Sequence, residues 1–364
     1  MSGHTLSNGG ARPEALALLK AGIAIPASPL ALTPERTHDH AIQRTLYRYY
    51  AAAGAGGIAV GVHTTQFEIR DPDVSLFQPV LEFAAQELQR LEQQHQRVIV
   101  RVAGVCGATP QALAEASLSR SLGYDAVLLS LATMKDATVE ELISHCQAIG
   151  EIMPLIGFYL QPAVGGRALP YEFWRRFAAL PTVVAIKMAP FNRYQTIDVV
   201  RGVADSGRAD EVTLYTGNDD NILVDLLTPY TFPKPDGGEI TLRIRGGLLG
   251  QFCVWTKTAV DLLHEIHELV DSGKPVPVDW LRKNAALTDA NAVIFDVAHN
   301  FAGCIPGIHE VLHRQGLMPN ILCLNPHETL SAGQGDEIDR ICRSYPFLTD
   351  DGFVSAHLAE WQQD

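Results

Sequence analysis

Short apolar runs rich in β-branched residues recur at a nearly regular spacing along the first two-thirds of the chain. We expect eight strands, which begin near Ile23, Gly57, Val98, Ala126, Leu155, Val183, Val212 and Leu242. The later starts lie about 30 residues apart, and amphipathic stretches such as 110–122 and 139–152 separate them. A strand and a helix repeated eight times over roughly 250 residues are typical of a closed (β/α)8 barrel, the TIM barrel.

A doubly wound open sheet is the structural alternative. Such a sheet needs fewer strands and usually carries a glycine-rich nucleotide loop after its first strand. The segment after the first expected strand reads PASPLALTPER and contains no glycine. Two stretches compete for strand eight, the run at Leu242 and LLGQFCV at 248–254, and the turn-rich segment 228–240 before them is typical of an insertion.

The pattern becomes helical after about residue 254. We expect helices over 258–271, 279–295, 307–315 and 335–344. The sequence therefore predicts a catalytic barrel domain over residues 1–275 and a helical C-terminal extension over residues 276–364.

Charge and cysteine usage limit the partners of the protein. The formal net charge is -13, and an acidic surface repels phosphate backbones and anionic headgroups, so we expect neither a nucleic-acid nor a membrane partner. The six cysteines are scattered without a CxxC pair, which favours reduced thiols and a cytoplasmic protein. No secretory leader is visible at the N-terminus, and no apolar run approaches about 18 residues.

Lys187 stands in the segment VVAIKMAP, inside a strand that we expect to be buried. Burying an ammonium group is costly, so such a lysine is either paired with a carboxylate or has a lowered pKa. A lowered pKa supplies the free amine that attacks a carbonyl carbon. The local sequence leaves both interpretations open.

Tyr159 ends the preceding strand and lies one strand–helix unit before Lys187, so we expect the two side chains at the same level of adjacent strands. A phenol beside an amine can relay protons, although a barrel-rim tyrosine is also common. Thr64 and Thr65 follow the second strand, where hydroxyls and backbone N–H groups can hold a carboxylate or simply cap a loop.

Together these residues resemble the dihydrodipicolinate synthase / N-acetylneuraminate lyase family of class I Schiff-base aldolases, over about residues 20–265. The similar segments are PASP at 26–29, GAGGIAVGVHTT at 54–65, GYDAVLL at 123–129, FYLQP at 158–162, VVAIK at 183–187 and TGNDD at 216–220. The spacing between Tyr159 and Lys187 matches the family's tyrosine and its Schiff-base lysine.

The resemblance implies a lyase that binds pyruvate or a related 2-keto acid as an imine to Lys187. Tyr159 would then move protons, while Thr64 and Thr65 would hold the substrate carboxylate. The protonated imine serves as the electron sink for carbon–carbon cleavage or condensation, so no further cofactor is expected. The family resemblance also implies a homo-oligomer, a dimer or tetramer.

Departures from the family pattern argue against dihydrodipicolinate synthase itself. The family's GTTGE segment reads HTTQFE at 63–68, and its carboxylate-binding arginine is Val164 here, with Arg167 three residues further as a substitute. The second tyrosine of the synthase has no match at 131–136.

Further binding residues are expected around the pocket. His63 is new at the rim, where it can bind substrate or serve structure. Gly217 and Asn218, with Asp219, lie at the end of strand seven, where they can line the pocket or cap the next helix.

Three other functions compete with the aldolase. The same lysine imine serves 2-keto-3-deoxy sugar acid dehydratases, and a barrel that has lost turnover would be a non-catalytic homologue. HEVLH at 309–313 matches H-E-x-x-H, so a zinc hydrolase using His309 and His313 is the third. Because no neighbouring segment supplies a third ligand, we expect no metal site and a packing helix there.

Overall fold

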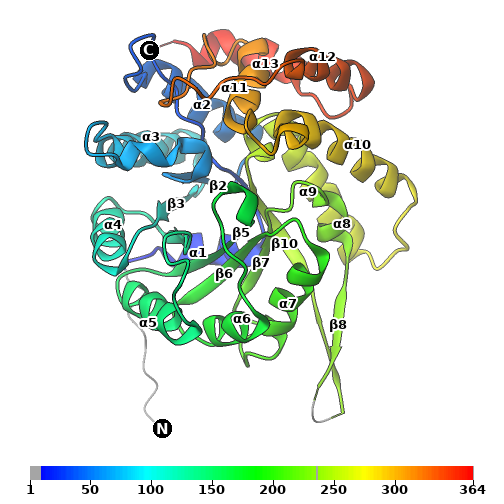
Figure 1. Ribbon diagram of the computed structural model, residues 1–364. Coiled ribbons are helices and arrows are strands. Elements are labelled where there is room, and N and C mark those ends of the chain that lie inside the picture. The colour runs from blue at the N-terminus through cyan, green and yellow to red at the C-terminus, as the bar shows by residue number, and fades with distance from the viewer. Residues whose placement is uncertain (1–9, 235–236, 364) are drawn as a thin grey trace.

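Eight parallel strands form a barrel in the computed structural model, which describes residues 10–234 and 237–363 (Figure 1). The strands are β1 (Ala24–Pro26), β2 (Gly57–Val60), β3 (Val100–Val105), β4 (Ala126–Leu129), β5 (Leu155–Leu160), β6 (Val183–Ala189), β7 (Thr213–Thr216) and β10 (Ile244–Leu249). They are hydrogen-bonded in the order β1-β10-β7-β6-β5-β4-β3-β2, and a parallel bridge between Ala27 and Ala59 joins the two ends. The predicted (β/α)8 barrel is confirmed.

Helices follow the strands and cover the outside of the barrel. They are α2 (His40–Ala53), α3 (Phe77–His95), α4 (Thr109–Ser121), α5 (Val139–Gly150), α6 (Tyr171–Ala178), α7 (Arg193–Ala204), α8 (Ile222–Leu227) and α9 (Thr256–Asp271). Local sequence sets several starts: the Asp39 side chain accepts hydrogen bonds from two N–H groups of α2, and Thr138 with Glu141 forms a capping box on α5.

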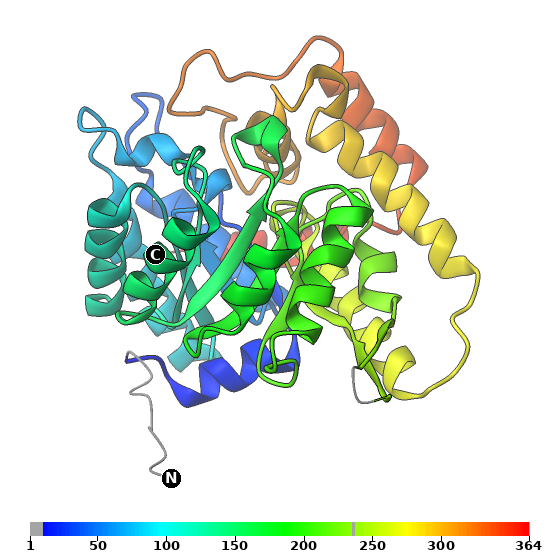
Figure 2. The same cartoon turned by 60° about the horizontal axis from the view of Figure 1, so that its bottom comes forward.

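A short first helix, α1 (Pro13–Ala21), lies across the amino-terminal end of the barrel (Figure 2). The Tyr215 hydroxyl of β7 donates to the carbonyl oxygen of Leu19 at 2.7 Å, which ties α1 to the barrel floor. The opposite end, where the strands finish, is therefore the open end at which TIM barrels carry their active sites.

Strand eight lies between the two stretches that compete for it in the sequence. β10 begins at Ile244 and ends at Leu249, so it takes residues from both. The segment before it is an insertion, as expected, and forms an antiparallel hairpin of β8 (Tyr230–Pro233) and β9 (Glu239–Leu242) that projects from the barrel (Figure 1).

The pairing of β5 with β6 carries an irregularity that changes which side chains face inward. Leu155 pairs with Val183, but the register then shifts, so that Phe158 pairs with Lys187 and Tyr159 pairs with Met188. A one-residue shift moves every later side chain to the other face of the strand. The expectation that Tyr159 stands at the level of Lys187 is therefore wrong.

The C-terminal extension is helical, as predicted, with α10 (Asp279–Ile294), α11 (Cys304–Arg314), α12 (Gln334–Ser344) and α13 (Asp351–Trp361). It lies over the open end of the barrel (Figure 1). The Tyr49 hydroxyl of α2 donates to Asp350 at 2.7 Å, and the apolar core runs without a break into α10 and α11. The domain boundary at residue 275 stays a prediction.

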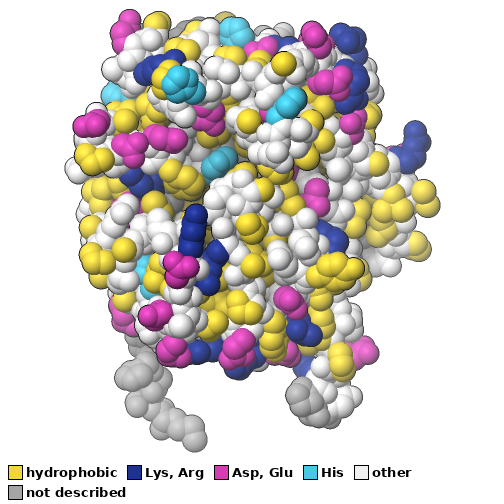
Figure 3. Space-filling model, viewed as in Figure 1, with side chains coloured by type: hydrophobic (Ala, Val, Ile, Leu, Met, Phe, Trp, Pro, Cys, Tyr) yellow, Lys and Arg dark blue, Asp and Glu magenta, His cyan; other side chains and the backbone are white. Residues whose placement is uncertain are grey.

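Acidic and basic side chains are interspersed with apolar ones on the face shown in Figure 3. Surface pairs such as Arg314 with Asp339 and Arg340 with Asp289 fix several acidic groups of the extension. Within the described ranges, no helix is both long and apolar enough to cross a bilayer.

Candidate active site

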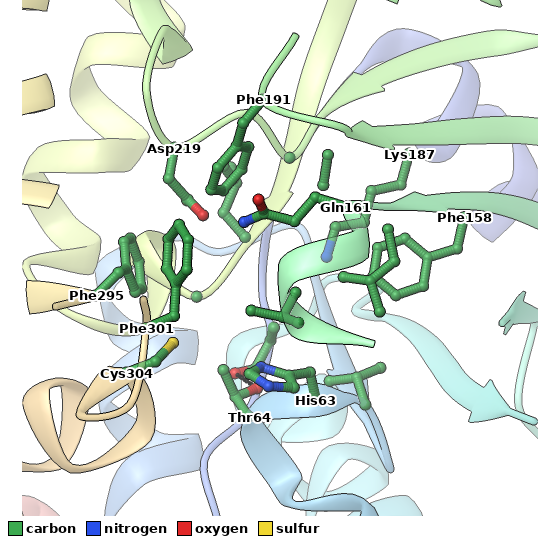
Figure 4. Close-up of a pocket in the computed structure, with 18 residues that line it drawn as sticks. His63, Thr64, Phe158, Gln161, Lys187, Phe191, Asp219, Phe295, Phe301 and Cys304 are labelled. Carbon is green, nitrogen blue, oxygen red and sulfur yellow. Dashed lines mark hydrogen bonds between the residues drawn. The ribbon is translucent and has the colours of Figure 1, made fainter. Parts of the chain in front are cut away.

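A cavity of about 70 Å³ lies at the carboxyl ends of the strands, beneath the C-terminal extension (Figure 4). Its walls come from the ends of β1, β2, β5, β6, β7 and β10 and from the segment that leads into α11. The lining residues are Ala27, Val62, His63, Thr64, Phe158, Leu160, Gln161, Val164, Lys187, Ala189, Phe191, Gly217, Asp219, Leu249, Gly250, Phe295, Phe301 and Cys304.

Lys187 reaches this cavity from β6, and its amine points into it (Figure 4). The Nζ atom lies 4.4 Å from the centroid of the Phe158 ring. In the part of the chain that the structure describes, no hydrogen bond or ion pair holds the amine. Burial lowers the pKa of Lys187, because the ammonium form is poorly solvated there, while the charge of Asp219 opposes this shift. Burial therefore favours the free amine.

Gly217 leaves the space through which the lysine side chain passes. A Cβ atom at this position would lie 2.7 Å from Cε of Lys187 and 3.0 Å from Cβ of Ala189. The Gly217 N–H donates to the carbonyl oxygen of Met188 at 2.7 Å, which fixes the end of β7 against β6. Glycine is therefore required by close packing around the amine.

Asn218 supports the cavity wall without lining the cavity. Its Oδ1 accepts a hydrogen bond from the Phe191 N–H at 3.1 Å, and its Nδ2 donates to Asp225 at 2.9 Å and to Thr196 at 3.3 Å. The fully buried amide thus links the loops after β6 and β7, which leaves it no donor for a substrate.

Asp219 contributes a carboxylate to the cavity, across from the lysine (Figure 4). Its Oδ1 is buried and makes no hydrogen bond to any described residue. Burial raises the pKa of Asp219, while the charge of Lys187 lowers it. The carboxylate and the amine therefore influence each other without forming an ion pair within hydrogen-bonding distance.

The segment after β2 provides a threonine and a histidine. The Thr64 hydroxyl donates to the carbonyl oxygen of Ala27 and faces the cavity. His63 lines the cavity too, and burial together with the neighbouring lysine lowers the pKa of His63 to about 4, so the imidazole is neutral. Thr65 instead donates to the Ser28 carbonyl at 2.8 Å and accepts from the Gly61 N–H at 3.0 Å, which makes it a loop cap.

Two predicted site residues lie away from the cavity. The Tyr159 hydroxyl accepts a hydrogen bond from the Leu169 N–H at 3.2 Å, and its ring packs 5.1 Å from that of Trp174 on α6. The Arg167 guanidinium donates to backbone carbonyls of Met134 and Ala137. The structure thus brings Lys187, Thr64, His63 and Gly217 together, and leaves Tyr159, Thr65, Asn218 and Arg167 outside the cavity.

Four phenylalanines line the cavity, and the sequence patterns predicted none of them. Phe158 lies beside the amine, Phe191 follows β6, and Phe295 and Phe301 come from the extension. The rings of Phe191 and Phe301 have centroids 5.9 Å apart, which joins the extension to the barrel rim. Phe158 was not predicted to face the cavity because the register shift between β5 and β6 cannot be seen in the sequence. Phe295 and Phe301 were not predicted because no sequence pattern indicates that the extension packs over the barrel.

The HEVLH segment lies on α11. The ring of His309 is fully buried, with Nδ1 3.4 Å from the Ile321 carbonyl oxygen, and Nδ1 of His313 donates to the Met318 carbonyl at 2.9 Å. Among residues 10–234 and 237–363, no group of three or more histidine, cysteine or acidic side chains is arranged to hold a metal ion. Nothing in this geometry favours the zinc hydrolase.

The chain was compared with protein-family models and with curated protein sequences. Residues 79–228 match the model of the dihydrodipicolinate synthetase family. No curated protein sequence matches the chain significantly. The predicted resemblance to this family is confirmed over the matched residues.

Several solved structures share the fold. A monomeric dihydrodipicolinate synthase variant has a TM-score of 0.69 at 19% identity, covering 92% of this chain and 99% of its own. YagE, a prophage protein from E. coli K12 solved with pyruvate, has a TM-score of 0.69 at 15% identity, covering 90% and 99%. CdNal from Clostridium difficile, solved with mannosamine, has a TM-score of 0.69 at 16% identity, covering 89% and 99%.

Proposed function

We propose that the protein is a lyase that binds pyruvate or a related 2-keto acid as a covalent imine on Lys187 and then cleaves or forms a carbon–carbon bond. The observation that carries this proposal is a buried amine that faces a cavity at the carboxyl ends of the barrel strands and has no hydrogen-bond or ion-pair partner among the described residues. Such an amine is the nucleophile that imine formation requires.

The environment of the amine supports its reactivity. Burial favours the uncharged form of Lys187, and the adjacent Phe158 ring stabilises the positive charge that appears on nitrogen in the protonated imine. The protonated imine withdraws electrons from the neighbouring carbon, so a carbanion there is stabilised. No further cofactor is needed for this chemistry.

The size and lining of the cavity support a compact keto acid. Thr64, on the 3-10 turn η1 (His63–Thr65), lines the cavity, and its hydroxyl would exchange its hydrogen bond to the Ala27 carbonyl for one to the substrate carboxylate. YagE was solved in complex with pyruvate, which supports the same ligand class for this chain. Assembly into a dimer or tetramer stays a prediction.

Reductive trapping tests the proposal. Incubation of the protein with pyruvate and borohydride is expected to add one reduced pyruvate to Lys187, measured by intact mass and peptide mapping. Lys187→Ala is expected to give no adduct and no turnover. Lys257→Ala is the matched control, because Lys257 is an exposed lysine held by Asp261 on the barrel exterior.

An adduct that persists in Lys187→Ala, or none in the unmodified protein, would rule the imine out. Product analysis with panels of aldehydes and of sugar acids then separates carbon–carbon cleavage from dehydration by the same imine.

A further inference from the structure

The imine chemistry needs a proton donor and acceptor inside the cavity, and the tyrosine expected to serve lies outside it. The Tyr159 hydroxyl is bound to the Leu169 backbone on the outer side of β5. Among the described residues, the titratable side chains that line the cavity are His63, Lys187, Asp219 and Cys304. These four side chains are the titratable groups in the cavity that could move the protons which the amine does not move itself.

Among these four groups, Asp219 combines an anchored backbone with a carboxylate oxygen that lacks a hydrogen-bond donor among the described residues. Its backbone carbonyl accepts a hydrogen bond from Asn291 of α10 at 2.8 Å, which anchors the residue, while its Oδ1 is buried and no described residue donates a hydrogen bond to it. The next residue, Asp220, differs: its side chain is 41% exposed and lies 3.7 Å from Arg193. Two adjacent aspartates thus have opposite environments.

The other cavity groups suit the task less well. Burial lowers the pKa of His63 to about 4, so near neutral pH the imidazole is uncharged and is a weak base without an acidic imidazolium proton. Burial raises the pKa of the Cys304 thiol well above its usual range, so the thiol does not become a base. An aspartate that is shifted toward its protonated form can both donate and accept.

We propose that Asp219 is the catalytic acid and base of the imine chemistry, a role that rests on the proposed function. It lines the same cavity as Lys187, and the two groups come from neighbouring strands, β6 and β7. The substrate carbons would lie between them.

The reaction balances with these two groups and the substrates. The Lys187 nitrogen bonds to C2 of the keto acid, and one amine proton moves to the former carbonyl oxygen. Protonated Asp219 donates its proton to that hydroxyl, the C–O bond breaks, water leaves, and the nitrogen lone pair closes the C=N bond. The Asp219 carboxylate then removes a proton from C3, and the C–H electron pair forms the enamine.

The remaining steps form the carbon–carbon bond, release the product and restore the starting forms of Lys187 and Asp219. The enamine C3 bonds to an acceptor carbonyl carbon, and Asp219 protonates the resulting alkoxide. Addition of one water to the imine releases the product and restores the amine; the reverse sequence describes cleavage.

The electrostatics of the cavity support this assignment. Burial shifts the pKa of Lys187 down and that of Asp219 up, so both shifts favour the amine and carboxylic acid forms that the first step uses. The other titratable groups that face Asp219 are Cys253 on η4 (Gln251–Cys253), Cys304 on α11 and the adjacent Asp220.

The test compares Asp219→Asn with Asp220→Asn as matched control and Asp219→Glu as the conservative variant. Two rates are measured with pyruvate across pH: borohydride trapping on Lys187, and exchange of the methyl protons for deuterium. Asp219→Asn is expected to slow both by about 10²-fold or more, Asp220→Asn to leave both near wild type, and Asp219→Glu to recover part of the loss.

The pH profile separates catalysis from structure. Wild-type trapping should rise and then fall with pH, since it needs a neutral amine and a protonated acid, and the fall at high pH should vanish in Asp219→Asn. A purely electrostatic role would instead speed trapping in Asp219→Asn, because removal of the carboxylate lowers the Lys187 pKa further.

If Asp219→Asn traps and exchanges at the wild-type rate or faster, and its rates still fall at high pH, Asp219 is not the acid and base. That result would leave the imine on Lys187 intact. Absence of any adduct in the wild type would overturn the imine itself, so the two failures are distinguishable. Thermal unfolding checks each variant. If Asp219→Asn does not fold, the wild-type exchange profile decides, and a profile without an alkaline fall overturns the proposal.

Discussion

Replacement of Gly217 by alanine tests whether the position of the amine, rather than its mere presence, controls reactivity. The new Cβ would lie 2.7 Å from Cε of Lys187, whereas carbon atoms in contact are separated by about 3.5–4.0 Å. The Ala189 Cβ, 3.0 Å away on β6, needs to shift by only a few tenths of an ångström, so most of the adjustment falls on the flexible lysine. The lysine side chain must therefore move by about 1 Å.

The rate effect follows from that displacement. A misplacement of about 1 Å costs about 10²-fold in rate, which corresponds to about 2.7 kcal/mol of activation free energy. Gly217 does not have a positive φ, so alanine adds no backbone strain there and the fold should persist.

The assay is the rate of borohydride trapping with pyruvate, together with thermal unfolding. Gly352→Ala is the matched control, because Gly352 lies in the first turn of α13 and has open space around it. The control should trap at the wild-type rate. A Gly217→Ala variant that also traps at the wild-type rate would refute the packing argument, because the amine would then tolerate a different position.

Two further predictions concern side chains that the cavity does not use. Tyr159→Phe is expected to lower stability by about 1–3 kcal/mol in denaturant titration, because the buried Leu169 N–H loses its acceptor, and to leave trapping unchanged; slowed trapping would restore a catalytic phenol. Burial lowers the pKa of His309 to about 4, so this residue should contribute about 3 kcal/mol to the fall in the free energy of unfolding as pH drops from about 6.5 to 4, since only the unfolded chain takes up the proton readily. Titration of His309→Asn at pH 7 and at pH 4.5 checks this, and an equal pH dependence in both proteins would contradict it.

The strands were predictable because a buried barrel strand has a strong apolar signal and a fixed repeat. The expected start of strand six at Val183 and of strand four at Ala126 coincide with the first residues of β6 and β4. Lys187 was predictable for the same reason, since an ammonium group inside such a run is rare without a special environment.

Which face each side chain takes was not predictable. The register irregularity after Leu155 depends on how two strands pair, and neither strand encodes it alone. It places Phe158 beside the lysine and turns Tyr159 toward α6. The phenylalanines of the extension were not predicted because contacts between residues a hundred positions apart leave no local pattern. The local sequence around Asp219 fits a helix cap and a cavity-lining residue equally well, so it could not distinguish the two.

The roof of the cavity comes from the far end of the chain. Phe295, Phe301 and Cys304 close over strands that precede them by about 50 to 270 residues. Without this roof the lysine would be open to water, where the ammonium form is better solvated and its pKa would lie closer to the ordinary value. The burial that favours the free amine is therefore complete only when the last helices are packed on the barrel.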